Sequence, residues 1–230
     1  MVEALERASQ DADVRVIVLG SGPKAFCSGA DLTGAISMVM GGEGLPNYDK
    51  IIRNHFHALI RAVTNAPKPV IASIRGSAVG FGFDLALACD LRISSQSGKF
   101  GALFVQRALV PDGGSSFTLS RLIGLHRAME LILLGDTFDA AKAQELGLLN
   151  RLTDEEQLET VTRELAQRLA DGPPMALRLA RANILASLSG SFDEALEREL
   201  HAQVQCLQSQ DVMEGVQAFF EKRKPAFKGC

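Results

Sequence analysis

The chain has few of the features that mark secreted, membrane or nucleic-acid-binding proteins. Its 230 residues include four cysteines with no Cys-x-x-Cys pair, and residues 1–6 do not form a basic, apolar leader. We therefore expect reduced thiols and a cytoplasmic location. The longest apolar runs, such as residues 85–89 and 132–134, are far shorter than a bilayer span and predict no membrane partner. Lysines and arginines number 24 against 27 aspartates and glutamates and are scattered, so no nucleic-acid partner is expected.

Histidine is also scarce, and its spacing matches no metal site. His55 and His57 stand at i and i+2, which face apart on a helix, while His126 and His201 are isolated. The sequence therefore predicts no metal ion.

Two glycine-rich turns are the most informative feature that is present. Residues 25–31 read AFCSGAD and follow a β-branched run, and residues 76–84 read GSAVGFGFD and follow another. Glycines that end strands leave backbone N–H groups outside any ladder and let a ligand approach the main chain. Two such groups can hold a carbonyl oxygen as it becomes an enolate. The pair of turns therefore predicts an oxyanion hole.

The order of elements predicts an α/β protein. Helical, β-branched and glycine-rich segments alternate up to about residue 139, which favours a repeating β/α spiral over an antiparallel sandwich. The expected helices are 2–11, 48–63 and 85–89, and the expected strands are 14–19, 70–74 and 91–95. A further helical stretch is expected from residues 113–116 to about 134.

Beyond residue 139 the chain reads as almost wholly helical. The expected helices are 140–146, 154–170, 174–188 and 192–220. Residues 171–174, with sequence DGPP, mark a soft boundary to a segment too thin for an independent core. Its apolar face must pack on the spiral, on another subunit, or on both.

These motifs resemble the crotonase, or enoyl-CoA hydratase/isomerase, superfamily. The family places Phe-Cys-Ser-Gly-Ala-Asp after one strand and Gly-x-Ala-x-Gly-x-Gly-x-x-Leu-Ala-x-x-Cys-Asp after the next, as residues 26–31 and 76–90 do here, and residues 219–227 match its ending. The resemblance implies a crotonase-like ββα spiral at 1–170 that binds acyl-CoA, and a C-terminal helical trimerisation region at 171–230. A homotrimer or a dimer of trimers is expected. The family's opening β-hairpin is absent, because this chain begins at the helix that follows it.

The resemblance also assigns the oxyanion hole. In the family two backbone N–H groups hold the thioester enolate of a coenzyme A ester, and the matching positions are Ser28 and Phe81. The second position is usually glycine, so the Phe81 ring must point away from the acyl chain or shorten the pocket. Coenzyme A enters as part of the substrate, and no separate cofactor is expected.

Further contacts follow from the same match. Ala25, Phe26, Ala30 and Phe104 are expected at the substrate, and Lys222 matches a lysine that reaches the coenzyme A phosphates. A solvated basic cluster at a helix end is the alternative interpretation of Lys222.

Two aspartates are the candidate catalytic groups. Family hydratases hold one water with two glutamates, and here those positions read Asp84 and Phe104, so the usual hydration pair is incomplete. Asp112 stands where the family's Δ3-Δ2-enoyl-CoA isomerases carry a single base. Val110, Pro111 and Phe104 are expected to raise its pKa by desolvation. An acyl-CoA double-bond isomerase is the leading hypothesis.

The alternatives remain open at this stage. Asp112 precedes Gly-Gly-Ser and is also a good helix N-cap, and Asp84 could complement a helix dipole. A hydratase or other lyase using Asp84, and a non-catalytic acyl-CoA-binding member, are the competing functions. A dinucleotide-binding or P-loop fold is disfavoured, because Leu85 stands where a GxGxxG motif needs glycine and no P-loop lysine follows.

Three nearby features have other interpretations. Asp31 is expected to cap a helix from residue 32, and Cys27, with no histidine in its motif, is expected to be a buried thiol rather than a nucleophile. Residues 37–45, rich in methionine and glycine, are expected to form an adaptable apolar pocket wall.

Overall fold

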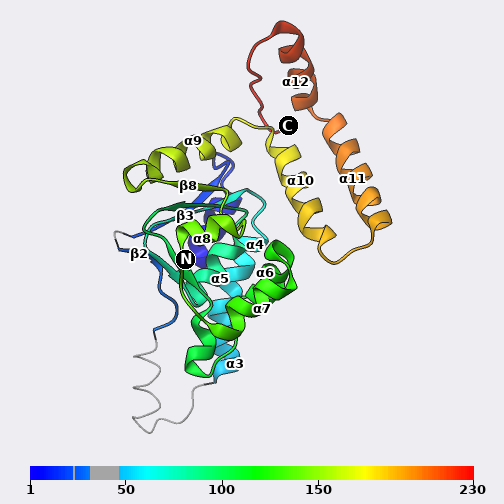
Figure 1. Ribbon diagram of the computed structural model, residues 1–230. Coiled ribbons are helices and arrows are strands. Elements are labelled where there is room, and N and C mark those ends of the chain that lie inside the picture. Colours follow the sequence, from blue (N-terminus) through cyan, green and yellow to red (C-terminus); the bar gives the residue numbers. More distant parts are fainter. Residues whose placement is uncertain (23, 32–46) are drawn as a thin grey trace. The chain divides into compact units, whose positions relative to one another are not determined.

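The computed structural model describes residues 1–22, 24–31 and 47–230. The chain divides into two compact units (Figure 1). The first contains residues 1–7, 18–66 and 70–162, and the second contains residues 8–17, 67–69 and 163–230. The predicted boundary at residues 170 and 171 falls inside the second unit.

One sheet, which lies mostly in the first unit, contains three neighbouring parallel strands, β3, β5 and β8. Its order is β1-β3-β5-β8, and β5 pairs in parallel with both β3 and β8. All five residues of β3 are buried, as expected for a parallel strand covered on both faces. The strand bounds are β1 Ile17–Gly20, β3 Val70–Ile74, β5 Leu91–Ser95 and β8 Arg151–Thr153.

The second sheet brings the two glycine turns together. Its order is β2-β4-β6-β7, with β4 parallel to both β2 and β6 and with β7 antiparallel to β6. Because β2 and β4 are parallel neighbours, the turns that follow them leave the same edge of the sheet. The bounds are β2 Ala25–Cys27, β4 Ser77–Val79, β6 Lys99–Gly101 and β7 Phe138–Asp139.

The helices of the first unit confirm the predicted β/α alternation. The expected helix 48–63 is one helical stretch with a π-helical turn, η1, between two α-helical parts. The bounds are α1 Val2–Gln10, α3 Tyr48–Ile51, η1 Ile52–His57, α4 Ala58–Thr64, α5 Phe81–Ala88, η2 Leu103–Arg107, α6 Ser115–Ile123, α7 Leu125–Leu134, α8 Ala140–Glu145, η3 Glu155–Gln157 and α9 Leu158–Ala170. Of these, α1 and α9 continue into the second unit.

An aromatic cluster joins α5 to the second sheet. The rings of Phe83, Phe100 and Phe138 lie 5.8 to 6.2 Å apart, and Phe83 and Phe100 are almost fully buried. Buried aromatic side chains contribute large apolar areas to a core. This cluster fixes α5, and with it the second glycine turn, on the sheet.

The second unit contains three consecutive helices: α10 Pro174–Ser187, α11 Phe192–Leu207 and α12 Gln210–Glu221. The prediction of one helix over 192–220 is wrong, because the helical stretch breaks at Gln208 and Ser209. The Ser209 side chain accepts a hydrogen bond from the Val212 N–H and so caps a new helix. Hydrophobic periodicity that continues across the break concealed it.

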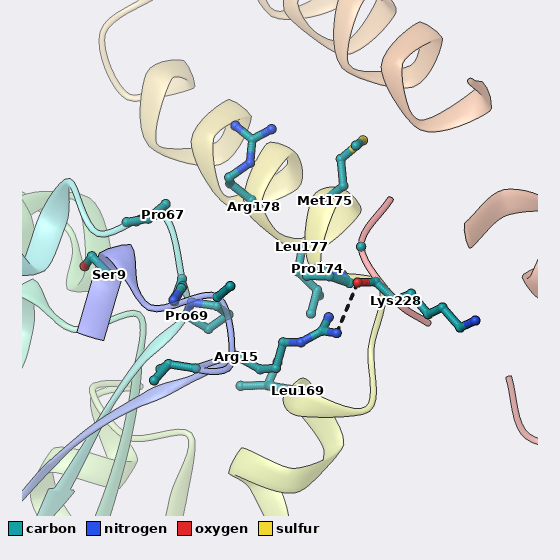
Figure 2. Close-up of a pocket in the computed structure, with 14 residues that line it drawn as sticks. Ser9, Arg15, Pro67, Pro69, Leu169, Pro174, Met175, Leu177, Arg178 and Lys228 are labelled. Atoms are coloured by element: carbon teal, nitrogen blue, oxygen red, sulfur yellow. Dashed lines mark hydrogen bonds between the residues drawn. The ribbon is translucent and has the colours of Figure 1, made fainter. Parts of the chain in front are cut away.

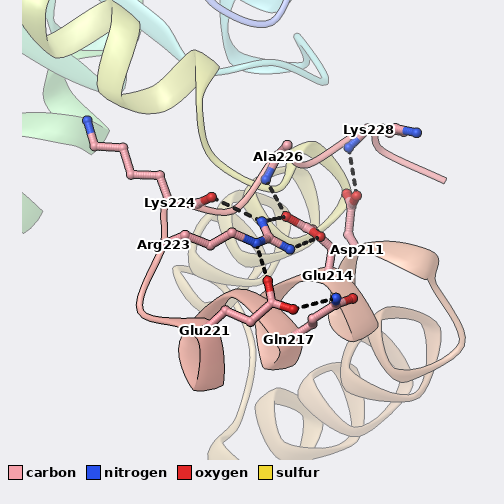
Figure 3. A network of polar contacts seen from close by, with 8 residues as sticks. All are labelled: Asp211, Glu214, Gln217, Glu221, Arg223, Lys224, Ala226 and Lys228. Atoms are coloured by element: carbon pink, nitrogen blue, oxygen red, sulfur yellow. Dashed lines mark hydrogen bonds and ion pairs between the residues drawn. The ribbon is translucent and has the colours of Figure 1, made fainter.

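Two carboxylates of α12 hold the last residues of the chain (Figure 3). Asp211 accepts the N–H groups of Lys228 and Gly229 at 2.7 and 2.8 Å. Glu214 accepts hydrogen bonds from both Arg223 Nη atoms, at 2.6 and 2.9 Å, and from the Ala226 N–H at 2.7 Å. The Arg223 and Ala226 hydrogen bonds lower the pKa of Glu214 to about 2.

In the part of the chain that the structure describes, no helix is both long and apolar enough to span a bilayer.

Candidate active site

The two glycine turns lie side by side. A Cβ placed on Gly29 would lie 3.3 Å from the Val79 carbonyl oxygen and 3.8 Å from the Phe81 backbone nitrogen. Gly29 and Gly80 both have positive φ, of 99° and 57°, which favours glycine at these positions. The structure therefore places the turn that carries Ser28 beside the turn that carries Phe81.

The backbone N–H of Phe81 opens a helix. Phe81 is the first residue of α5, so its N–H has no acceptor within that helix. The next residue, Gly82, packs so closely on β2 that a Cβ there would overlap the Cys27 carbonyl. The helix N-terminus is thus held against the end of the neighbouring strand, where a developing negative charge is favoured.

A cavity of about 160 Å³ lies at this place. It includes five of the predicted site residues: Ser28, Ala30, Phe81, Phe104 and Asp112. The other lining residues are Gly29, Phe56, Val79, Gly80, Leu103, Arg107 and Leu109. The side chains are mostly apolar, with one carboxylate and one guanidinium group.

The Phe81 ring forms part of the cavity wall. It is 7% exposed and packs edge-on against Phe56, with ring centroids 4.7 Å apart. Phe104 is likewise buried and lines the same cavity. Whether the ring shortens the space for an acyl chain stays a prediction.

Asp112 presents a carboxylate oxygen without a partner. Its Oδ1 atom is buried and makes no hydrogen bond to any described residue. Burial raises the pKa of Asp112, while the Asp112 backbone N–H and, to a smaller extent, the charge of His57 oppose the rise. The N-cap interpretation is wrong, because α6 begins at Ser115 after Gly114 and no side chain caps it. The carboxylate is therefore not used by the helix that follows.

Asp84 lies behind the cavity rather than in its wall. It is 1% exposed, and its Oδ2 accepts the Gly113 N–H at 2.7 Å. Burial raises the pKa of Asp84 to about 6, and the Asp112 charge adds to the rise. The nearby Ser115 hydroxyl and the Gly113 hydrogen bond oppose the rise. The Ser115 hydroxyl does not form a hydrogen bond with Asp84 in this structure. Asp84 does stand in the first turn of α5, as the dipole interpretation requires.

Three other predicted residues do not line the cavity. Ala25 and Phe26 belong to β2, and Lys222 belongs to the second unit, where it ends α12 in the left-handed conformation. The helix that Asp31 was expected to cap and the pocket wall expected at 37–45 lie outside the described residues. Cys27 is a free, half-buried thiol.

Sequence reasoning missed Phe56, His57 and Arg107. Phe56 and His57 come from the π-helical turn, and Arg107 ends η2. Phe56 lies on the apolar face of the helix predicted over 48–63. That position predicts burial, but it does not predict that the side chain lines a cavity. The sequence indicated no role for His57 beyond that of a metal ligand, which its spacing from His55 excluded. Among the described residues, no group of three or more potential ligands forms a metal site.

A larger cavity, of about 380 Å³, lies within the second unit (Figure 2). Its charged lining residues are Arg15, Lys68, Arg178 and Lys228. The amine of Lys68 donates to two backbone carbonyls, including that of Ala8, and Arg15 donates to the Lys228 carbonyl. Figure 2 shows the Arg15, Arg178 and Lys228 side chains extending in different directions. This cavity has no carboxylate in its wall, so the first unit holds the better candidate for a site with a carboxylate base.

Comparison with known proteins agrees with the geometry. The family model for enoyl-CoA hydratase/isomerase matches residues 1–230. The chain belongs to the enoyl-CoA hydratase/isomerase family. This confirms the resemblance to the crotonase superfamily, whose members are enzymes acting on acyl-CoA thioesters.

Relatives within the family carry different activities. The chain is 34% identical over 229 residues to the 1,2-epoxyphenylacetyl-CoA isomerase of Escherichia coli, covering 100% of this chain and 87% of that protein. It is 34% identical over 232 residues to human mitochondrial methylglutaconyl-CoA hydratase, covering 99% and 67%. The crystal structure of an enoyl-CoA hydratase from Bacillus anthracis superposes with a TM-score of 0.90 at 35% identity, covering 99% of this chain and 86% of that one. The crotonase fold predicted from the motifs is thereby confirmed.

Proposed function

We propose that this member of the enoyl-CoA hydratase/isomerase family is an acyl-CoA double-bond isomerase of the Δ3-Δ2-enoyl-CoA type. The observation that carries the proposal is the unpartnered, buried Oδ1 of Asp112 in the same cavity as the two glycine turns. A single carboxylate suffices for moving a double bond along an acyl chain.

The oxyanion hole would act first. The N–H groups of Ser28 and Phe81 would donate to the thioester oxygen, and these bonds would strengthen as the oxygen gains charge in the enolate. Support comes from the side-by-side placement of the two turns and from the position of Phe81 at the start of α5.

Asp112 would then move one proton. Its carboxylate takes the proton from C2 of a 3-enoyl thioester, which gives the enolate, and returns the proton to C4, which leaves the double bond at C2. Burial, by raising the pKa of Asp112, makes it a stronger base than a solvated aspartate.

Hydration by the usual pair of carboxylates has less support. Phe104 lines the cavity with a ring that cannot orient or deprotonate water, and the Asp84 carboxylate is not part of the cavity wall. These two observations favour the isomerase over a hydratase or lyase that uses Asp84.

A second candidate is isomerisation of an acyl group that carries a ring. It is favoured by the aromatic wall of Phe56, Phe81 and Phe104, since flat rings pack well against aromatic side chains. The E. coli relative is named for such a substrate, 1,2-epoxyphenylacetyl-CoA.

The remaining expectations form part of the proposal and are supported by the resemblance alone. They are assembly as a homotrimer or dimer of trimers, contact of Lys222, Ala25 and Phe26 with the substrate, a cytoplasmic location, and no cofactor beyond the coenzyme A of the substrate.

A panel of substrates tests the proposal. The purified protein is assayed with 2-enoyl-, 3-enoyl- and 1,2-epoxyphenylacetyl-CoA, and the products are separated by chromatography. We expect turnover of the 3-enoyl or ring-bearing thioester and no hydration of the 2-enoyl thioester above background. Hydration as the dominant reaction would overturn the isomerase, and acyl-CoA binding without any turnover would favour the non-catalytic alternative.

A further inference from the structure

A hydrogen bond to the Asp84 side chain joins it to the loop that carries Asp112. Asp84 Oδ2 accepts the Gly113 N–H at 2.7 Å, inside a site where Asp84 is 1% exposed. The other oxygen, Oδ1, is buried and has no partner among the described residues. The carboxylate therefore holds the backbone of the residue that directly follows Asp112.

The fit between Asp84 and Gly113 is tight. A Cβ on Gly113 would lie 2.5 Å from the Asp84 Cβ and 2.6 Å from Oδ2, distances that real Cβ atoms essentially never show. Glycine thus lets the loop approach the carboxylate closely enough for its N–H to be shared.

The held N–H belongs to the peptide that links Asp112 to Gly113. Fixing the plane of this peptide restricts ψ of Asp112, and through it the direction of the Asp112 side chain. Asp112 lines the cavity whereas Asp84 does not. The side-chain hydrogen bond of Asp84 therefore links it to the cavity through the peptide next to Asp112.

We propose that Asp84 is a positioning residue, which holds the Asp112–Gly113 peptide and thereby keeps the Asp112 carboxylate at the cavity. The inference rests on the proposed function, in which Asp112 is the base. It differs from the interpretation of Asp84 as a second acid or base, because Asp84 touches a backbone N–H and not the substrate.

Among the described residues, the charged groups that face the pair include His57 and Arg107, which lines the same cavity as Asp112. Asp112 acts on Asp84, and His57 acts on Asp112. Asparagine at position 84 keeps an oxygen that can accept the Gly113 N–H but carries no charge, whereas alanine removes the acceptor. The two substitutions therefore separate the hydrogen bond from the charge.

Steady-state kinetics with the accepted substrate tests the positioning role. We expect Asp84→Ala to lower kcat by about 10- to 100-fold with KM little changed, since a misplaced catalytic group costs turnover. Asp84→Asn should recover most of the lost kcat.

Asp139→Ala is the matched control. Asp139 is the N-cap of α8, its side chain accepts a hydrogen bond from the Lys142 backbone N–H, and it does not line the cavity. The control should keep wild-type kcat, and wild-type kcat in Asp84→Ala would overturn the proposal.

A second measurement does not depend on turnover or on the folding of Asp84→Ala. The amide resonance of Gly113 is followed by NMR against pH in the full-length protein and in Asp84→Asn. We expect it to titrate near pH 6 in the wild type, because the pKa of Asp84 is about 6, and to lose this transition in Asp84→Asn. A Gly113 resonance that is the same in the wild type and in Asp84→Asn at every pH would contradict the contact. If the transition is present but Asp112→Asn keeps full activity, the proposed function fails while the contact stands.

Discussion

Phe104 and Asp112 together determine what the cavity can do. Phe104 occupies a position at which family hydratases carry a glutamate, and its ring removes one of the two groups needed to hold water. Asp112 supplies a carboxylate with an unpartnered buried oxygen. In the proposed function, Phe104 thus disfavours hydration and Asp112 supplies the base for isomerisation.

The pH dependence of turnover follows from Asp112. Only the ionised carboxylate accepts a proton, and burial raises the pKa of Asp112 above its ordinary value of 3.8. We therefore expect kcat/KM to fall as the pH falls, with a midpoint above that ordinary value. A pH–rate profile of kcat/KM reports this ionisation in the free enzyme.

His57 offers a matched variant for the same profile. Its positive charge lowers the pKa of Asp112, so His57→Gln should move the midpoint to higher pH. A midpoint at or below the ordinary value in the wild type, or a shift to lower pH in His57→Gln, would contradict the assignment.

Among the elements, η2 ends in an unusual conformation. Ala108, its C-terminal cap, has φ of 56° and ψ of 30°, in the left-handed region that residues with a Cβ rarely adopt. It joins the helical turn that carries Phe104 and Arg107 to the loop that carries Asp112. The strained residue therefore lies between two segments that both contribute side chains to the cavity wall.

Relief of this strain is measurable. Ala108→Gly should raise the free energy of unfolding by a few tenths to about 1 kcal/mol, because glycine adopts positive φ without a Cβ clash. Ala58→Gly is the control, since Ala58 has φ of −60° at the start of α4, and glycine in a helix should cost about 1 kcal/mol. Urea unfolding measures both, and a loss of stability in Ala108→Gly would contradict the strain.

The glycine turns could be predicted because their signal is local. A β-branched run followed by glycines marks a strand end whatever the rest of the chain does, and both turns were found. The place of Asp84 could not be predicted in this way. It depends on Gly113, 29 residues further on, whose missing Cβ creates the space for the carboxylate. His57 was missed because a π-helical turn changes which residues share a helix face.

For the whole molecule, Asp84 makes stability depend on pH. Its pKa is about 6 in the folded protein against 3.8 ordinarily, so between these values the folded state binds a proton that the unfolded state has lost. Stability therefore falls as the pH rises from about 4 to about 6, by on the order of 3 kcal/mol from this group. If Asp84 positions Asp112 as proposed, this loss of stability at neutral pH is the cost of that role.

The difference between wild type and Asp84→Asn isolates this contribution from those of other carboxylates, such as Glu214. Urea unfolding at a series of pH values should show the variant gaining stability relative to the wild type as the pH rises through this window. A difference that is constant with pH, or that changes in the opposite direction, would show that Asp84 is not the buried, reluctantly ionised group described above.

The most direct test of the central claim is the turnover of a 3-enoyl-CoA thioester by Asp112→Asn. The amide keeps the size of the side chain but cannot act as a base, so we expect kcat to fall by about 100-fold or more. Asp136→Asn, which changes an exposed aspartate of the same unit, should keep wild-type kcat. Near-normal isomerisation by Asp112→Asn would contradict the account.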